Sequence, residues 1–492
     1  MFVVHKVAHI LKNYIFISKN HIPSKKTTSM LTPLPKECPE PLAWPGLLDQ
    51  LQQSQTLAAI VIAAWQMGLH IARILVEQQL NDRAQQPTRW GQCSVCGHRL
   101  HSKGFAKRQM LTLVGRVQWR RRVGRCPHGC VGSQSVPFDQ GLGIESYQQS
   151  SLELMRLGCL LAIFVPFELA AWLLSQLSGI RVSDDSLWQW VQQYGEQATN
   201  NGEAAVEIWQ QGDSPAVEDL SEALAAMPLL IAADGVTVPL RPQLGTPKGK
   251  TRWREVKVAL LARLSHRISR NGKQVTELQQ RRLVAVLGDM QTFQPRLQLE
   301  AIRQGIETAS QVVWLSDGAR GFWRLFEACF AQLAVVGVLD FYHAAAHLWQ
   351  AADAYRDGNP ARTPQMWFER LRHQLRHGYI HRILKELRWL SRSPNTAAPT
   401  KAILKRVHDY FETHQQHVQY RQFKKQGIPI GSGMIESACK WLVQQRFKGV
   451  GMRWSEPGFN HLLALRVAWV NQRFDPLFAP HSLTLPIVSP NR

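Results

Sequence analysis

The clearest shortage in this 492-residue chain is of acidic side chains. Asp and Glu number 36 against 58 Lys and Arg, which gives a formal net charge of +22 at pH 7. Such a charge does not report on the fold, but it favours a polyanionic partner, and nucleic acid is the usual one. An anionic membrane surface is the alternative. With 45% hydrophobic and 19% charged residues, the chain has the composition of folded domains, and its length suggests about three of them.

Two other features are missing. No contiguous apolar run reaches the roughly 18 residues of a transmembrane helix, so we expect no membrane partner. The first stretch also lacks the clean apolar core and the small-residue cleavage site of a signal peptide. A Pro-rich segment begins at Met30. We therefore expect translation to start there, with residues 1–29 as an annotation artefact and residues 1–45 as a disordered or mis-annotated extension.

Dense cysteine spacing is absent as well, which argues against a secreted disulfide framework and for a reducing compartment. Of eight cysteines, four form two close pairs, Cys93-x-x-Cys96 and Cys126-x-x-x-Cys130. A segment with period-two alternation separates the pairs, which is the layout of a zinc ribbon, expected over residues 89–140. Thiolates at such spacings can reach one tetrahedral Zn²⁺ at about 2.3 Å per bond. His128 could replace one thiolate, and unliganded surface thiols are the alternative.

Basic residues follow the first cysteine pair. We expect Arg116, Arg120, Arg121 and Arg122 to meet DNA phosphates, although arginine runs are often only solvated.

Helical periodicity marks residues 46–88 and again residues 145–205. In the second region, Pro166 to Gly195 reads as two short helices separated by Ser178-Gly179, with Ser183 as the N-cap of the second. Two short helices joined by a tight Gly turn suit a helix-turn-helix that reads DNA, although any helical hairpin would look similar.

From Leu229 the texture changes to short apolar strands. The pattern predicts strand, strand, strand, helix, strand, helix, strand over residues 226–343. This is the element order of an RNase H-like core with a mixed sheet, although other mixed folds share pieces of it. Residues 344–425 predict an all-helical insertion, residues 426–475 the last catalytic helix with a basic segment, and residues 476–492 a tail. The expected fold is therefore multidomain α/β, with the zinc ribbon and the helix-turn-helix ahead of the core.

Three acids stand where such a core needs metal ligands. Asp234 is expected to end the first strand and Asp317 the fourth, at adjacent strand ends in the centre of the sheet, while Glu436 follows a Gly-containing loop on a later helix. Carboxylates that end apolar strands are costly unless they bind something. Oxygen ligands of this kind suit Mg²⁺ or Mn²⁺. The alternative is that each Asp-Gly is only a turn.

A fourth acid complicates the assignment. Asp340 is expected to end the fifth strand, three residues before His343. It could be the second metal ligand in place of Asp317. We rank Asp317 first because the fifth strand lies one further from Asp234, which leaves Asp340 and His343 to orient or tune the site. A packed histidine that caps the next helix is the alternative for His343.

The segment after Glu436 is basic and aromatic. Lys440 lies one helical turn on and could hold a phosphate, or form a simple surface pair with Glu436. This segment could contact a DNA backbone and stack on a base. The residues concerned are Arg446, Lys448, Arg453 and Trp454, and the alternative for the tryptophan is a place in the core.

At this point the chain resembles bacterial insertion-sequence transposases of the ISKra class, which are related to Mutator-like elements. The resemblance covers roughly residues 90–475 and rests on CSVCGHRLHSKGF, TLVGRVQWRRRVGRC, AADGVTV, WLSDGARGFW, LDFYHAAAHLW, GSGMIESACK and RFKGVGMRWS. It implies a Mg²⁺-dependent DDE triad at Asp234, Asp317 and Glu436, and an acid-x-x-His signature at Asp340 and His343. It also implies a helical insertion before the catalytic Glu.

The resulting expectation is a transposase that binds the terminal inverted repeats of its element and cleaves and joins DNA strands. Its partners would be double-stranded DNA, as transposon ends and target, and further copies of itself as a homodimer or higher. It would act in the bacterial cytoplasm, at the nucleoid. The alternatives are an RNase H-like nuclease that cuts without joining, and a transposon-derived DNA-binding protein without catalysis.

Overall fold

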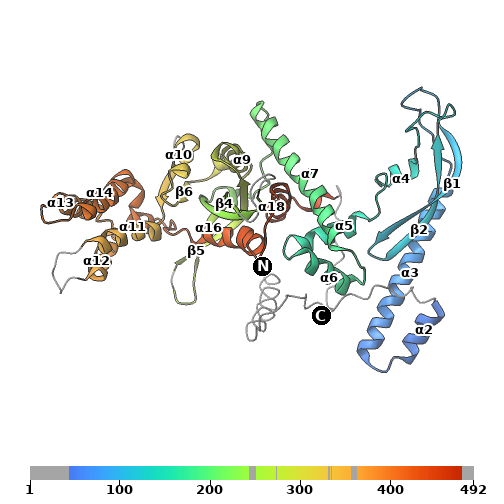
Figure 1. Cartoon of the computed structure of the whole chain (residues 1–492), viewed down its shortest axis with the longest axis horizontal. Coiled ribbons are helices and arrows are strands. Elements are labelled where there is room, and N and C mark those ends of the chain that lie inside the picture. Colours follow the sequence, from blue (N-terminus) through green and yellow to red (C-terminus); the bar gives the residue numbers. More distant parts are fainter. Residues whose placement is uncertain are drawn as a thin grey trace. The chain divides into compact units, whose positions relative to one another are not determined.

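The computed structural model describes residues 44–242, 251–272, 274–330, 333, 335–355 and 363–478. The expected start at Met30, most of the N-terminal extension and most of the C-terminal tail lie outside the described residues. The chain divides into two compact units, Met1–Leu75 and Val76–Arg492. The boundary between them falls inside helix α3(Leu57–Gln85), which is labelled in Figure 1.

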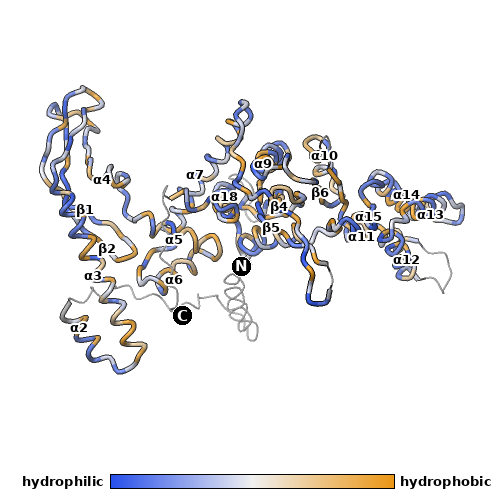
Figure 2. The backbone as a smooth tube through the Cα atoms, turned by 180° about the vertical axis from the view of Figure 1, so that it is seen from behind, coloured by the Kyte–Doolittle hydropathy of each residue, from blue (hydrophilic) through white to orange (hydrophobic). Residues whose placement is uncertain are grey.

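The first unit contains α2(Trp44–Gln53) and the beginning of α3. Apolar residues follow one another along α3, and many of them are exposed (Figure 2). By length and composition α3 could cross a membrane, and only 6% of its most apolar window is buried. The mean hydropathy of α3 is high although a few polar residues interrupt its apolar run, and the absence of a membrane partner stays a prediction.

A two-stranded hairpin follows, made of β1(His101–Thr112) and β2(Gly115–Arg125) in antiparallel register. Its side chains alternate, so that Met110, Val117 and Trp119 form a small core on one face, against which Leu80 of α3 packs. The side chains of Glu77 and Asn81 accept hydrogen bonds from backbone amides of β2 at 2.9 and 3.0 Å. The end of α3 thus covers the outer edge of the hairpin, where strand amides would otherwise lack partners.

Three helices come next: α5(Leu152–Ala162), α6(Phe167–Ser178) and α7(Asp184–Gln210). Gly179 ends α6 with a φ of 73°, and the Ser183 side chain caps α7 by accepting from the amide of Ser186, which confirms the predicted N-cap. The expectation of two short helices is wrong for the second, since α7 runs for 27 residues. Gly195 lets α7 approach α18(Glu456–Val470) closely, because a Cβ there would clash with His461.

The centre of the second unit is a five-stranded mixed sheet, which confirms the mixed α/β class. Its spatial order is β5-β4-β3-β6-β7. The β5-β4 and β4-β3 pairs are antiparallel, whereas β3-β6 and β6-β7 are parallel. The strands are β3(Leu229–Leu240), β4(Arg252–Ile268), β5(Gln274–Leu287), β6(Val312–Ser316) and β7(Val335–Leu339).

Helical crossovers lead from β5 to β6 and from β6 to β7, because strands that run in the same direction cannot be joined by a tight turn. These are α9(Met290–Arg303), with the short η2(Ile306–Thr308), and α10(Arg320–Cys329). All residues of β6 are buried, and the fully buried Trp314 packs on Phe326 and Phe330 at ring-centroid distances of 5.9 and 5.7 Å. Continuous apolar runs such as VVWLS form strands that are covered on both faces, which is why they lack alternation.

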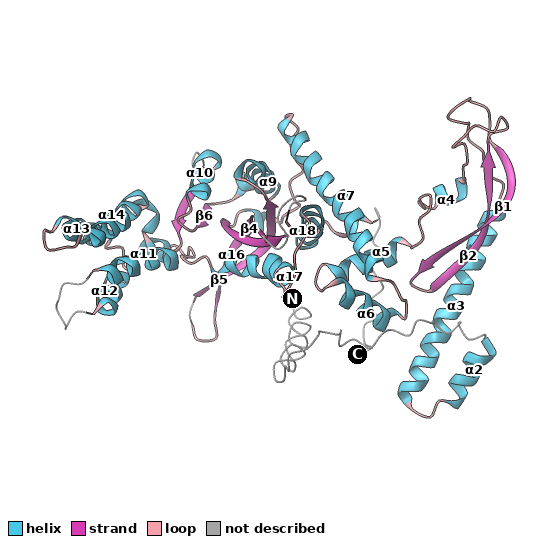
Figure 3. Cartoon of the chain, viewed as in Figure 1, coloured by secondary structure: helices cyan, strands magenta, loops and turns pink. Residues whose placement is uncertain are grey.

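Every regular element in the described stretch after β7 is a helix, and loops and turns join the helices (Figure 3). It comprises α11(Phe341–Ala354), α12(Pro364–Arg376), α13(Ile380–Arg392), α14(Ala398–Thr413), η3(Gln415–Val418) and α15(Tyr420–Lys425). The chain then returns to the sheet through α16(Gly433–Cys439), the π-helix η4(Lys440–Gln444), α17(Gln445–Phe447) and α18.

Candidate active site and metal centre

Three carboxylates come from one row of the sheet. Ala233 of β3 pairs with Ser316 of β6, and Ser316 pairs with Leu339 of β7. The next residue in each chain segment is an aspartate, so Asp234, Asp317 and Asp340 lie at one edge of the parallel part of the sheet. The adjacency of β3 and β6, and the more distant place of β7, agree with the sequence-based expectation.

The expectation that Asp234 ends its strand is wrong. Asp234 pairs with Val258 of β4, and β3 continues to Leu240. Only the parallel pairing with β6 stops before Asp234. Pairing with the antiparallel strand β4 keeps β3 extended beyond Asp234, so Asp234 lies within a paired strand rather than in a turn. Its side chain accepts from the amide of Gly235 at 2.7 Å.

A loop before α16 brings Glu436 to the same edge. The backbone amide of Ser432 donates to the carboxylate of Asp340 at 2.6 Å, and the Ser432 hydroxyl donates to Glu436 at 2.6 Å. The amide of Phe341 donates to the carbonyl of Ile430 at 2.9 Å. The two contacts of backbone amides fasten the returning chain to the end of β7, and the Ser432 hydroxyl holds Glu436 beside the aspartates. Sequence reasoning did not single out Ser432, although its place before a helix was a usable signal.

The acids affect one another electrostatically. Burial raises the pKa of Asp234 above its usual range, and the negative charges of Asp317 and Glu436 raise that pKa further. Among the described residues, the oxygens of these three acids do not form a group lying mutually within 4.8 Å. Asp317 keeps a partly exposed side chain that accepts from the amide of Ala319 at 3.0 Å. Glu436 is exposed. The site is an open cluster of mutually repelling carboxylates.

Asp340 differs from its neighbours because it is fully buried and heavily hydrogen-bonded. It accepts from the amide and the ring of His343, at 2.6 and 2.9 Å, in addition to Ser432. Burial alone would raise its pKa, but these donors hold the pKa below its usual range. The hydrogen bond to Asp340 raises the pKa of His343 to about 9, so His343 is a cation at neutral pH. Asp340 thus has fewer free oxygen positions than Asp317.

The basic segment after Glu436 divides into exposed and buried residues. Lys440, at the start of the π-helix, and Arg453 are exposed, and the ammonium of Lys448 lies 5.7 Å from the ring centroid of Trp253. Arg446 and Trp454 are corrections to the expected DNA contacts, because they are only 2% and 8% exposed.

Internal contacts account for both buried residues. Arg446 donates to the carbonyl of Ala162 at 3.0 Å, and its guanidinium lies 5.1 Å from the Trp454 ring. The Trp454 indole donates to the carbonyl of Phe447 at 3.1 Å. These two side chains join the segment after α16 to α5 and to the core, so they contribute packing rather than a surface for DNA.

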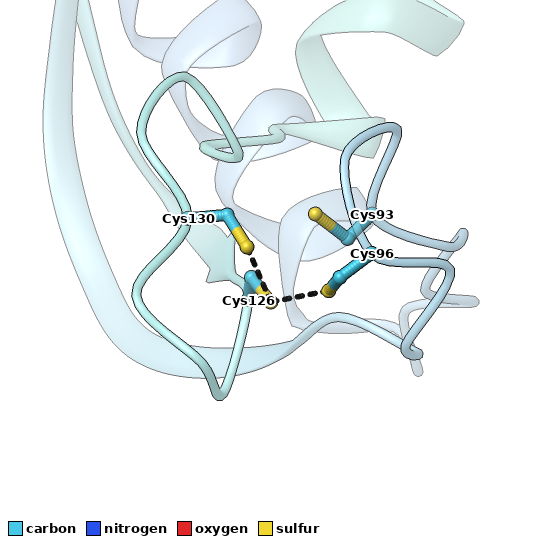
Figure 4. Close-up of side chains that lie close together, drawn as sticks. All are labelled: Cys93, Cys96, Cys126 and Cys130. Atoms are coloured by element: carbon cyan, nitrogen blue, oxygen red, sulfur yellow. Dashed lines mark hydrogen bonds between the residues drawn. The ribbon is translucent and has the colours of Figure 1, made fainter.

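A second candidate centre is the four-cysteine cluster (Figure 4). The sulfurs of Cys93, Cys96, Cys126 and Cys130 lie within 4.8 Å of one another, so the group could hold a metal ion such as Zn²⁺. The Cys96 and Cys126 sulfurs are 3.3 Å apart. Hydrogen bonds from backbone amides, first that of Val95, lower the pKa of Cys93 to about 7. Hydrogen bonds with the other sulfurs, first that of Cys96, raise the pKa of Cys130 to about 12.

The arginines of β2 alternate between two faces. Arg116 and Arg120 are exposed, and the half-buried Arg122 lies 5.1 Å from the Phe105 ring centroid. Arg121 is another correction, because it is 8% exposed and its guanidinium donates to Asp139 at 3.1 Å. Successive side chains of a strand point to opposite faces, so every second residue of an arginine run points inward. Arg121 is such a residue and needs a buried counter-ion.

No family model matches this chain, and no curated protein matches it. One solved structure that matches is the Drosophila P element transposase strand transfer complex, at 10% sequence identity and a TM-score of 0.32. The match covers 69% of this chain and 96% of that chain. A likeness at this level carries no argument about fold or activity, so the geometry above stands by itself.

Proposed function

We propose that this chain is a DDE-type DNA transposase of the insertion-sequence kind, which binds terminal inverted repeats and catalyses metal-dependent strand cleavage and strand transfer. The observation that carries the proposal is the acidic edge, defined as Asp234, Asp317, Asp340 and Glu436. Adjacent strands in register supply the three aspartates, and Ser432 links the fourth acid to them. The strand order, with its two helical crossovers, supports an RNase H-like core.

Asp234, Asp317 and Glu436 are the residues that would hold Mg²⁺ or Mn²⁺. Their donors are all carboxylate oxygens, which hard divalent cations prefer. Burial first, and then the negative charges of Asp317 and Glu436, raise the pKa of Asp234, and a bound cation would favour the charged form of this carboxylate. When bound, such ions activate a water or a 3′-hydroxyl and stabilise the leaving oxygen.

The remaining residues of the edge have positioning roles in this proposal. Ser432 holds Glu436 against the end of β7. The Asp340–His343 pair places a positive imidazolium near Asp234 and Asp317, where it offsets part of their charge and can attract a phosphodiester. Asp340 itself is committed to three donors, which favours Asp317 as the second metal ligand.

DNA binding is proposed from charge and exposure. The net charge of +22 provides long-range attraction for duplex DNA. Arg116 and Arg120 on the hairpin, and Lys440 and Arg453 after Glu436 in the sequence, are exposed and remain the candidate phosphate contacts. Zn²⁺ at the four cysteines would hold together the two knuckles, which are the loops that carry Cys93 and Cys96 before the hairpin and Cys126 and Cys130 after it. Synapsis of two DNA ends requires at least a dimer of the chain.

The test is strand cleavage and strand transfer by the full chain, with Mg²⁺ and duplexes that carry the terminal sequences bordering its gene. Asp234→Asn should abolish both reactions and leave DNA binding intact, whereas Glu327→Gln, which alters an exposed acid on α10, should leave both reactions unchanged. Cleavage without joining would identify a nuclease, and binding without cleavage a non-catalytic DNA-binding protein. Either outcome would overturn the proposal.

A further inference from the structure

A tyrosine of the helical insertion reaches the acidic edge without a hydrogen-bond partner. Tyr410 lies on α14, and its hydroxyl occupies the space that a Cβ on Gly318 would need. Gly318 directly follows Asp317, so the phenol stands against the loop that carries this carboxylate. The hydroxyl is buried, and no hydrogen bond satisfies it within the part of the chain that the structure describes. A buried, unsatisfied hydroxyl is rare in folded proteins and calls for a specific explanation.

Beside Tyr410 stands a second group with an unsatisfied atom. His347 of α11 stacks on the phenol ring, with centroids 3.9 Å apart and an interplanar angle of 28°. Its Nδ1 is buried and likewise has no partner among the described residues. Phe411 and His414 flank the same phenol, at centroid distances of 5.4 and 5.1 Å. These rings fix the orientation of Tyr410, so its hydroxyl is held in place without being used.

The charges around the phenol suit a neutral donor. Burial raises the pKa of Tyr410, and the negative charges of Asp317 and Asp340 raise it further. The hydroxyl therefore keeps its proton and is a poor nucleophile at neutral pH. The other charged groups nearby are Arg406 and His343, whose positive charges act on His347. The hydroxyl lacks an acceptor among the described residues, and the ligand expected at the acidic edge brings two, the non-bridging oxygens of a DNA phosphodiester.

We propose that the Tyr410 hydroxyl donates a hydrogen bond to a non-bridging oxygen of the DNA phosphate bound at the acidic edge. The helical insertion thereby supplies part of the phosphate-binding site, and His347 supports the phenol from behind. The absence of a side chain at Gly318 leaves the space through which the hydroxyl reaches this position. The inference rests on the proposed function for the identity of the ligand, and its test separates the two.

Two variants change the hydroxyl in different ways. Tyr410→Phe removes the oxygen and keeps the ring that stacks on His347, so the fold should be retained. Gly318→Ala keeps the oxygen but forces the phenol to move. Tyr379→Phe is the matched control, because it removes a phenol oxygen from an exposed residue of the same insertion.

The first measurement is binding of an uncleaved duplex in Ca²⁺, which needs no catalysis. We expect Tyr410→Phe and Gly318→Ala to weaken binding about 10-fold or more, with Tyr379→Phe unchanged, because a hydrogen bond to a charged group is lost. The second is single-turnover cleavage in Mg²⁺, where Tyr410→Phe should lower the rate about 10- to 100-fold. Of the two methylphosphonate stereoisomers at the scissile position, the duplex that lacks the contacted oxygen should bind wild type and Tyr410→Phe equally.

The outcomes separate the two proposals. If wild type cleaves and Tyr410→Phe binds and cleaves equally well, the phosphate contact is refuted and the transposase proposal stands. If wild type never cleaves but Tyr410→Phe still loses binding, the transposase proposal is refuted and the phosphate contact stands. A loss that is the same for the methylphosphonate duplex would show a merely structural role of the phenol and would also refute the contact.

Discussion

The backbone amide of Ser432 donates to the carboxylate of Asp340 across 2.6 Å, although 92 positions of sequence separate them. The Ser432 hydroxyl meanwhile holds Glu436. One residue thus serves two acids through two different groups, the backbone amide and the side chain. Substitution can remove the second contact without touching the first.

Ser432→Ala should therefore slow DNA cleavage without unfolding the protein. The backbone bond to Asp340 remains, but Glu436 loses the donor that orients it. A hydrogen bond to a charged group contributes about 1.5–3 kcal/mol, which corresponds to a loss of roughly 10- to 100-fold in rate. Single-turnover cleavage measures the effect, and Ser432→Thr should restore most of the rate. A Ser432→Ala enzyme as fast as wild type would show that this contact does not position Glu436.

The cysteine cluster gives a prediction about metal content. Elemental analysis of the purified protein should find about one Zn²⁺ per chain, and Cys126→Ser should lose it, since the other three sulfurs leave a tetrahedral site incomplete. Cys329→Ser, outside the cluster, should retain the metal. Metal loss should also expose the hairpin to protease, because the two knuckles are no longer joined. A metal-free wild type with an intact hairpin would contradict this account.

Two buried histidines predict how stability depends on pH. His414 and His417 pack on Trp323 at centroid distances of 4.9 and 4.1 Å, and burial lowers the pKa of each to about 4. In the unfolded chain both would titrate near 6.5. Between pH 4 and 6.5 the unfolded state therefore binds more protons than the folded state. The contribution of the two histidines to the free energy of unfolding is full above about pH 6.5 and falls as the pH drops towards 4.

Urea unfolding at a series of pH values tests this. His417→Phe keeps a ring beside Trp323 and removes one titrating group, so its free energy of unfolding should fall less steeply between pH 6.5 and 4 than that of wild type. Substitution of the exposed His377 should leave the slope unchanged. Parallel curves for wild type and His417→Phe would disprove the assignment.

The hairpin arginines should separate into two functional classes. Arg116→Gln and Arg120→Gln should each reduce the slope of log K against log salt by about 0.9, because each removes one phosphate contact. Equilibrium binding to duplex DNA at several salt concentrations measures the slope. An unchanged slope in both variants would remove the hairpin from the DNA-binding surface.

Arg121→Gln should instead destabilise the hairpin. It leaves Asp139 as a buried, unpaired charge, and breaking such a pair costs about 3–5 kcal/mol. Thermal unfolding of the full chain should show an early transition for Arg121→Gln, with the double variant Arg121→Met with Asp139→Leu recovering part of the loss. A single variant as stable as wild type would show that the pair is dispensable.

The sequence predicted the features that local patterns encode. Apolar runs indicated the strands of the sheet, and the aspartates after them indicated its edge. Continuation of β3 past Asp234 was not predicted, because it depends on pairing with β4, and pairing is not visible in one segment. Arg446 and Trp454 were misplaced for a similar reason, since their burial depends on Ala162 and Phe447. Nothing in the residues around Tyr410 indicates that it lies against Gly318, because only the tertiary fold brings them together.

The helical stretch leaves the sheet at Asp340 and comes back at Ser432, and these two residues are bonded to each other. The two ends of the helical stretch are therefore held together, and the positions of the sheet residues do not depend on how many residues lie between them. Helices could be gained, lost or exchanged there during evolution while the carboxylates kept their places. This architecture therefore permits the helical stretch to vary in length and sequence while the row of acids stays the same.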